Sequence, residues 1–300
     1  MQFGIWDTLF NLLLLVFWFR IWTDDDRDMF FNPYLGPLAR FSDSAIGFLR
    51  PVFFGLASRL IAAAALVLLL VLRAAAAPKG SGWILSLGFE IRQTGNPPFV
   101  ASMVFSALSF GIFLFKLWGL SLFYVPTRMG RPSAHNAAAL YHLAKPFSHV
   151  RREFRPIVLL VCGLAIAWLL HAFGTPPQDF IARNEFGLPP QILHAARNQP
   201  AAVAAGRILI SVLDAVVGII GVVLQLVFAL IIASWVSLLT GSHGLTFFCR
   251  EWMDMLLGPL RRHPIRIGML DLSPLIFILA VGFAQTVLHT ILLRSYLRLI

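Results

Sequence analysis

The sequence predicts an all-α polytopic membrane protein with six transmembrane helices, arranged as three parallel helical hairpins that each contain an amphipathic interfacial helix. Hydrophobic residues make up 58% of the 300 residues and charged residues 13%, whereas about a quarter of a soluble domain is charged. Several apolar runs reach the roughly 20 residues that a helix needs to cross a bilayer. The same order of features also recurs three times along the chain, which indicates an internal repeat.

The first hairpin is predicted over residues 1–75. Its first membrane helix spans Phe3–Trp22, and Arg20 and Trp22 mark its end because both residue types favour the membrane–water interface. The start of the chain has neither a basic region nor a small-residue cleavage site, so this helix is interpreted as one that stays rather than as a removed signal. An interfacial helix follows, with an apolar stripe at Leu38, Phe41, Ala45, Phe48 and Leu49.

The second membrane helix is predicted to begin at Pro51, directly after Arg50, because proline is tolerated in the first turn of a helix. It is expected to end near Leu72. Residues 76–96 carry proline, glycine and serine and are predicted to form a linker.

The middle hairpin is predicted over residues 97–174, with membrane helices at Phe99–Trp118 and from Pro156 to about Phe173. Lys116 and Trp118 repeat the pattern of a basic residue two positions before a tryptophan. The loop between the two helices is the most basic of the chain, and it carries an apolar stripe at Leu140, Leu143, Phe147 and Val150. The proline-rich residues 175–206 are predicted to form a surface loop.

The third hairpin is predicted over residues 207–300, with membrane helices from about Asp214 to Trp235 and over Pro274–Leu293. The stretch Trp252–Pro274 between them is too charged to cross a bilayer and too apolar for an ordinary soluble loop. Its apolar residues recur at helical spacing, at Trp252, Met255, Leu256, Pro259 and Leu260. This pattern predicts an interfacial helix, a turn and re-entry into the bilayer.

The distribution of lysine and arginine predicts the orientation. The loops inside the three hairpins contain 13 of these residues, against 8 on the opposite side. Because basic loops stay in the cytoplasm, the hairpin loops are predicted to be cytoplasmic and both termini to lie outside. The net charge of +10 is explained by these loops and their contact with anionic lipid, so nucleic acid is not the expected partner.

The third repeat resembles the YggT family of small bacterial and plastid membrane proteins. The resemblance is carried by Ser234-Trp235, by the segment Asp254–Arg262, and by Gly268–Pro274, which contains the Asp271-Leu-Ser273-Pro274 turn. The first repeat matches through the motif residues Arg20, Trp22, Asn32, Pro33 and Arg50.

The chain also departs from the family pattern. Members usually contain two repeats, so the middle hairpin is an additional, degenerate repeat without the Asp-x-Ser-Pro turn, and Met255 replaces a proline. The resemblance implies an integral membrane protein of the bacterial inner membrane or thylakoid. Members have been tied to osmotic tolerance, to haem attachment to a membrane cytochrome, and to nucleoid or division-related organisation. The family brings no catalytic residues.

Two groups of polar residues allow a structural and a functional interpretation. Asp271 and Ser273 are expected to cap the helix that begins at Pro274; the alternative is contact with a ligand or partner. The basic residues Arg151, Arg152, Arg155, Arg261, Arg262 and Arg266 are expected to bind anionic headgroups. The alternative for this group is docking of a membrane-protein partner.

Other chemistry receives little support from the sequence. His171 and His289 lie near helix ends and raise the possibility of haem binding, but the sequence has no HExxH motif, and Cys162 and Cys249 belong to no CxxC motif. No metal or cofactor is therefore expected. The sequence also lacks GxSxG and Walker-type motifs, which argues against an enzyme.

The sequence therefore predicts a non-enzymatic scaffold, or an assembly or stress-response factor, that acts through basic interfacial helices. The alternative is a transporter or channel linked to osmotic stress, which needs polar groups at mid-membrane depth. Gln225 and Gln285 are the candidates for that role, although they could also join two helices by a hydrogen bond.

Overall fold

The computed structural model describes residues 3–23, 31–54, 56–76, 83–94, 98–120, 122, 135–175, 201–241, 243–257, 265–267 and 270–299. Most of these residues are helical. Five of the described helices are long and apolar enough to cross a membrane: α3 (Ser58–Ala76), α4 (Phe99–Leu120), α7 (Arg155–Phe173), α10 (Ala201–Thr240) and α12 (Ser273–Arg298). Helix α1 (Phe3–Trp22) contributes a shorter apolar segment, Leu9–Trp22. The predicted class, a helical membrane protein, agrees with these helices.

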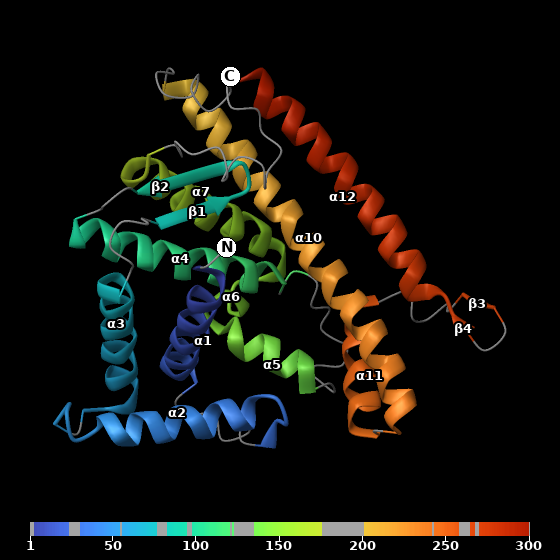
Figure 1. Ribbon diagram of the computed structural model, residues 1–300, viewed down its shortest axis with the longest axis horizontal. Coiled ribbons are helices and arrows are strands. Elements are labelled where there is room, and N and C mark those ends of the chain that lie inside the picture. Colours follow the sequence, from blue (N-terminus) through green and yellow to red (C-terminus); the bar gives the residue numbers. More distant parts are fainter. Residues whose placement is uncertain are drawn as a thin grey trace.

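The apolar helices pack against one another along the chain. Phe17 of α1 packs against Ile61 and Ala65 of α3. Gly163 of α7 lies against Phe115 of α4, and Gly282 of α12 lies against Leu224 of α10. In Figure 1, however, α4 runs across the ends of α1 and α3, while α10 and α12 form a slanted pair of their own.

Helix α3 begins at Ser58 and not at the predicted Pro51. Helix α2 (Leu35–Leu49) is followed by turns at residues 51–54, and the N–H groups of Arg50 and Phe53 still bond back to the carbonyls of Ile46 and Leu49. The chain then leaves the helical conformation at Phe54, whose φ is +51°. Pro51 thus lies in the turn that ends α2.

The predicted linker 76–96 contains a β-hairpin. Strand β1 (Trp83–Leu87) pairs antiparallel with β2 (Glu90–Thr94), and Leu87 stands opposite Glu90 next to the turn. The turn residue Gly88 has φ +58°, and a Cβ atom there would lie 1.9 Å from the carbonyl oxygen of Ser211 in α10. Only glycine allows the turn to approach the α10 backbone this closely.

Helix α10 is longer than the predicted membrane helix. Its 40 residues correspond to about 60 Å at 1.5 Å per residue, twice the roughly 30 Å of the hydrocarbon core. The helix takes in residues 201–206 of the predicted surface loop. The remainder of that loop, residues 176–200, lies outside the described residues.

The segments between the apolar helices contain helices, but the helix of the third segment, α11, begins at His243 and ends at Leu257, earlier than the helix predicted from Trp252 onward. These helices are α2, α5 (His135–Leu143), α6 (Lys145–Ser148), the 3₁₀ turn η3 (Arg152–Phe154) and α11 (His243–Leu257). Of the predicted apolar stripe in α2, Phe41 and Phe48 are exposed, whereas Leu38, Ala45 and Leu49 are half-buried and pack against the core. Helix α2 therefore has an apolar inner face and aromatic residues on its outer side.

Candidate functional site

Helices α2, α5 and α11 meet at one place. We call this place the interfacial junction and define it by Asn32, Tyr34, His135, Phe248, Glu251 and Trp252. In Figure 1, α2, α5 and α11 lie at the same end of the molecule. The core beneath the junction contains Phe19 of α1, Leu35 and Ala39 of α2, and Ala139 of α5. Helix α11 also contacts α5.

Asn32 starts α2 and joins it to α5. Its Oδ1 accepts hydrogen bonds from the N–H groups of Tyr34 at 2.9 Å and Leu35 at 3.1 Å, and its Nδ2 donates to the carbonyl of His135 at 2.9 Å. A side-chain amide can do both because it has a donor and an acceptor group. Asn32, followed by Pro33 in the predicted motif, therefore has a clear structural role.

Tyr34 joins α2 to α11. Its hydroxyl donates to Oε2 of Glu251 at 2.6 Å. Its ring packs edge-on against Phe248 and Trp252, with centroids 5.6 and 6.2 Å away. Burial, together with the hydrogen bond to Glu251, raises the pKa of Tyr34 above its ordinary value. Residues that are 217 positions apart in the sequence are thereby held together.

Other predicted motif residues strengthen contacts between helices near the junction. Arg20 of α1 forms a 2.8 Å ion pair with Asp43 of α2. The ring of Trp118 in α4 stacks on the ring of Phe147 in α6, with centroids 5.7 Å apart. It also packs against the ring of Trp18 in α1, with centroids 6.2 Å apart. Trp22 and Trp235 are exposed, as is Lys116.

The turn before α12 differs from the prediction at Ser273. Ser273 does not cap α12: its Oγ accepts from the N–H of Ile265 at 2.9 Å. It thereby closes the loop that contains β3 (Arg266–Ile267) and β4 (Leu270–Asp271). Leu272 occupies the N-cap position without a side-chain hydrogen bond, and Pro274 lies in the first turn as predicted. The side chain of Asp271 lies outside the described residues.

The predicted basic set is only partly described. Arg151 is exposed, as is Arg50 at the end of α2. The Nε of Arg155 donates to the carbonyl of Val150 at 3.1 Å. Arg261 and Arg262, together with the side chains of Arg152 and Arg266, lie outside the described residues. Ser234, next to Trp235, donates its hydroxyl to the carbonyl of Ile231 within α10.

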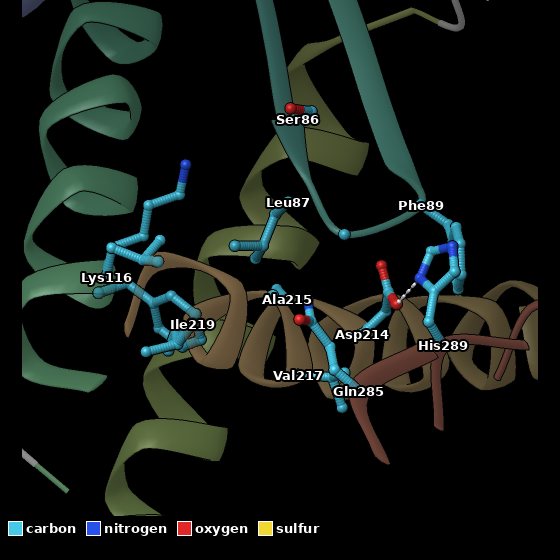
Figure 2. A pocket seen from close by; sticks show the side chains of 14 residues that line it. Ser86, Leu87, Phe89, Lys116, Asp214, Ala215, Val217, Ile219, Gln285 and His289 are labelled. Atoms are coloured by element: carbon cyan, nitrogen blue, oxygen red, sulfur yellow. Dashed lines mark hydrogen bonds and ion pairs between the residues drawn. The ribbon is translucent and has the colours of Figure 1, made fainter. Parts of the chain in front are cut away.

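A polar cavity lies beside the middle of α10, between the β-hairpin turn, α4, α10 and α12. We call it the hairpin cavity; its volume is about 380 Å³. It is lined by Ser86, Leu87, Gly88, Phe89, Phe115, Lys116, Asp214, Ala215, Val217, Gly218, Ile219, Val222, Gln285 and His289 (Figure 2). Within it, Oδ1 of Asp214 and Nδ1 of His289 are 2.7 Å apart.

A buried charged cluster adjoins the hairpin cavity on the far side of Phe89. Arg92 contacts both Glu90 and His171, and Arg207 donates to the hydroxyl of Tyr296 at 2.7 Å. Burial raises the pKa of Glu90, but the hydrogen bond to His171 and the charge of Arg92 outweigh it, so the net pKa is lowered. The ring of Phe89 lies 5.2 Å from the rings of both His289 and Tyr296.

The two histidines that the sequence raised as haem candidates each lie beside an acidic side chain. Nδ1 of His171 faces Glu90, and Nδ1 of His289 faces Asp214. Within the described part of the chain, no group of three or more histidine, cysteine and acidic side chains is placed to hold a metal ion. The two glutamines are also separated: Gln225 is exposed, whereas Gln285 lines the cavity and lies against Gly221.

Sequence reasoning missed Arg73, which it counted as part of a connector. The residue lies near the end of α3 and is buried. Its guanidinium donates to Oδ1 of Asn11 in α1 at 3.0 Å and to Oγ of Ser109 in α4 at 2.6 Å, and it lies over the ring of Trp83 at 5.4 Å. The sequence did contain a signal for this contact: Arg73 ends one apolar run, and Asn11 and Ser109 are polar residues inside two other apolar runs.

Comparison with known proteins agrees with the resemblance in the third repeat. Residues 207–292 match the CCB3/YggT family model. No curated protein and no solved structure gives a match to the chain. The matched segment contains most of α10, all of α11 and most of α12, and therefore the Glu251 side of the junction and the Asp214–His289 pair. Residues 207–292 are therefore similar to the CCB3/YggT family.

Proposed function

We propose that this protein belongs to the YggT family and is a non-enzymatic membrane scaffold that holds three interfacial segments together on one face of the bilayer. The observation that carries the proposal is the interfacial junction. Tyr34 bonds to Glu251 of α11, and Asn32 bonds to the His135 carbonyl of α5. Segments from all three hairpins therefore meet at one point, which is what a platform for assembly requires.

The outer side of α2 supports contact with lipid. Phe48 is 82% exposed and Phe54 is 97% exposed, and Phe31, Phe41 and Val52 are exposed beside them. Several exposed aromatic side chains on and beside one helix are unfavourable in water and fit the headgroup region of a bilayer. The described segments also present exposed arginines that suit anionic headgroups, at Arg40, Arg50, Arg151 and Arg250.

In this proposal the chain crosses the bacterial inner membrane six times as three hairpins, with the junction in the cytoplasm and both termini outside. A membrane-protein partner would dock on the basic residues around the junction. The five long apolar helices and the apolar α1 segment support the crossings, and the lysine and arginine distribution supports the orientation.

Labelling of single cysteines tests the shared face. In a variant with Cys162→Ser and Cys249→Ala, the separate changes Arg50→Cys, Arg151→Cys and Arg250→Cys should all react with an impermeant maleimide in inside-out vesicles. Arg298→Cys, at the other end of α12, serves as the control and should react only in right-side-out cells. Labelling of the first three positions from opposite faces would refute the platform.

A second experiment tests docking itself. Proteins that co-purify in mild detergent are compared between the wild type and the double variant Arg261→Glu/Arg262→Glu, with Arg298→Glu as the matched charge reversal at the far end. The proposal expects a specific partner to be lost only from the double variant while the protein stays inserted. An unchanged set of co-purifying proteins would contradict it.

The alternative function, a transporter or channel linked to osmotic stress, is favoured by one observation. The hairpin cavity brings Asp214, Gln285 and His289 together between α10 and α12, and such polar groups within membrane helices are typical of solute pathways. Saturable solute uptake in proteoliposomes that is abolished by Gln285→Leu but retained by Gln225→Leu would favour transport.

A further inference from the structure

We propose that the hairpin cavity is a binding site for a small zwitterion that carries an amine at one end and a carboxylate at the other. The cavity has a carboxylate, Asp214, towards one end and an ammonium group, Lys116, towards the other, with apolar side chains between them (Figure 2). This binding is separate from scaffolding at the interfacial junction, because the two places share no residue.

The cavity is built by close packing and not by a loose surface fold. The turn at Gly88 contacts the α10 backbone so closely that any side chain there would clash with Ser211. The next residue, Phe89, is buried between His289 and Tyr296 of α12. The hairpin is thus fixed to both helices and forms one wall of the cavity.

Asp214 provides the site for the amine. Its side chain is 11% exposed, and His289 holds one of its oxygens at 2.7 Å. The other oxygen points towards the hairpin turn, as Figure 2 shows. A carboxylate accepts several hydrogen bonds, so the oxygen at the turn can accept from an ammonium group while His289 keeps the side chain in place. The nearby Phe89 ring suits a cation as well.

Lys116 provides the site for the carboxylate. It extends from α4 across the cavity from Asp214, and the hydroxyl of Ser86 lies on the hairpin between them (Figure 2). Leu87, Ile219 and Val222 form the apolar surface along which a short methylene chain would lie. A ligand without an ammonium group would leave the mostly buried carboxylate of Asp214 with His289 alone. A ligand without a carboxylate would make no use of the ammonium group of Lys116, which is exposed.

The charged residues next to the cavity are not part of its lining, which keeps Asp214 and Lys116 as its charged groups. Glu90 is paired with Arg92 and His171, and Arg207 is bonded to Tyr296. Each of these groups therefore has a polar partner outside the cavity lining. The cavity volume of about 380 Å³ has room for about a dozen waters and lies at the lower end of the range for small-molecule sites.

The test uses three probes that differ only in their charged ends: 4-aminobutanoate, butylamine and butanoate. The purified full chain in nanodiscs is titrated with radiolabelled 4-aminobutanoate, and the other two compounds are used as competitors. We expect saturable binding of the zwitterion, with each singly charged compound at least tenfold weaker. Equal competition by butylamine or by butanoate would overturn the assignment, as would the lack of saturable binding.

Three variants locate the binding. Asp214→Asn and Lys116→Met should each weaken binding of 4-aminobutanoate by at least tenfold. Gly218→Leu should block it while keeping α10 intact, because a Cβ atom at Gly218 would meet no atom within 4 Å and leucine favours helix more than glycine does. Gln225→Ala, at an exposed position of the same helix, is the matched control. Unchanged affinity in Gly218→Leu would place any binding elsewhere and refute the proposal.

Discussion

The bond between Tyr34 and Glu251 allows a direct test of the interfacial junction. Tyr34→Phe removes the hydroxyl that donates to Glu251 at 2.6 Å but keeps the ring against Phe248 and Trp252. A hydrogen bond to a charged acceptor contributes about 1.5–3 kcal/mol when buried. Because Glu251 is half-exposed, we expect a loss of about 1 kcal/mol in the free energy of unfolding.

The assay is the unfolding equilibrium in mixed detergent micelles, measured for Tyr34→Phe, Glu251→Gln and the double variant. The double-mutant cycle isolates the coupling between the two side chains, which should be about 1 kcal/mol. Tyr34→Ala also removes the ring contacts and should be destabilised by about 2 kcal/mol more. A coupling energy near zero would show that the bond does not hold α2 to α11 and would refute the reasoning.

The pH dependence provides a second readout of the same bond. The pKa of Tyr34 is raised in the folded protein by burial and by Glu251. Its contribution to stability is therefore complete below the unfolded pKa of about 10 and is lost as the pH rises towards the folded value. Above about pH 10 the wild type should lose stability more steeply than Tyr34→Phe. Parallel curves for the two proteins would contradict this expectation.

Three further predictions concern the β-hairpin and the buried charges. Gly88→Ala places a methyl group 1.9 Å from the Ser211 carbonyl oxygen and should detach the hairpin from α10, measured as faster hydrogen exchange in residues 83–94. Arg73→Met leaves Asn11 and Ser109 without the donor they accept from and should lower the unfolding free energy by about 1–3 kcal/mol, measured by detergent unfolding. The pKa of Glu90 is lowered in the folded protein. The ionised Glu90 therefore stabilises the fold at pH values above the ordinary pKa of a glutamate, and this stabilisation is lost as the pH falls. Glu90→Gln should therefore reduce the melting temperature at pH 7 and flatten its dependence on pH below about pH 4.5.

The sequence predicts the membrane helices well because each is a long apolar run with a charged or aromatic end. Helix α1 matches its predicted bounds, Phe3–Trp22, and α4 extends two residues beyond the predicted Trp118. Pro51 was misleading because proline is equally suited to a turn and to the first turn of a helix. The local sequence does not show that the chain reverses at Phe54, where φ is positive.

The β-hairpin was missed for a different reason. Trp83, Leu85 and Leu87 are buried while Ile84 is exposed, so the period-two pattern of a strand is present in the sequence. The surrounding proline, glycine and serine made the stretch resemble a linker. Its stability comes from the contact of Gly88 with α10 and from the packing of Phe89 on α12, and these partners are more than 100 residues away in the chain.

The polar sites depend even more on tertiary contacts. Asn32 was recognised as a motif residue, but its partner is a backbone carbonyl at position 135, which no side-chain pattern can reveal. Asp214 and His289 were noted separately, one as an interface residue and one as a possible haem ligand. Their pairing requires α10 and α12 to be antiparallel neighbours in one particular register. Helical periodicity fixes the face of a residue on its own helix but not the residue that it meets on another helix.

The two sites of the molecule therefore carry different kinds of interaction. At the interfacial junction, the contacts of Asn32 and Tyr34 join helices of different hairpins through hydrogen bonds and aromatic packing. At the hairpin cavity, charged groups converge around a space with room for a small molecule. Helix α10 connects the two places, because Asp214 lies in its first half and Ser237 near its end accepts a hydrogen bond from Thr246 of α11. The proposed ligand site and the Glu251 side of the junction are therefore joined through one continuous helix.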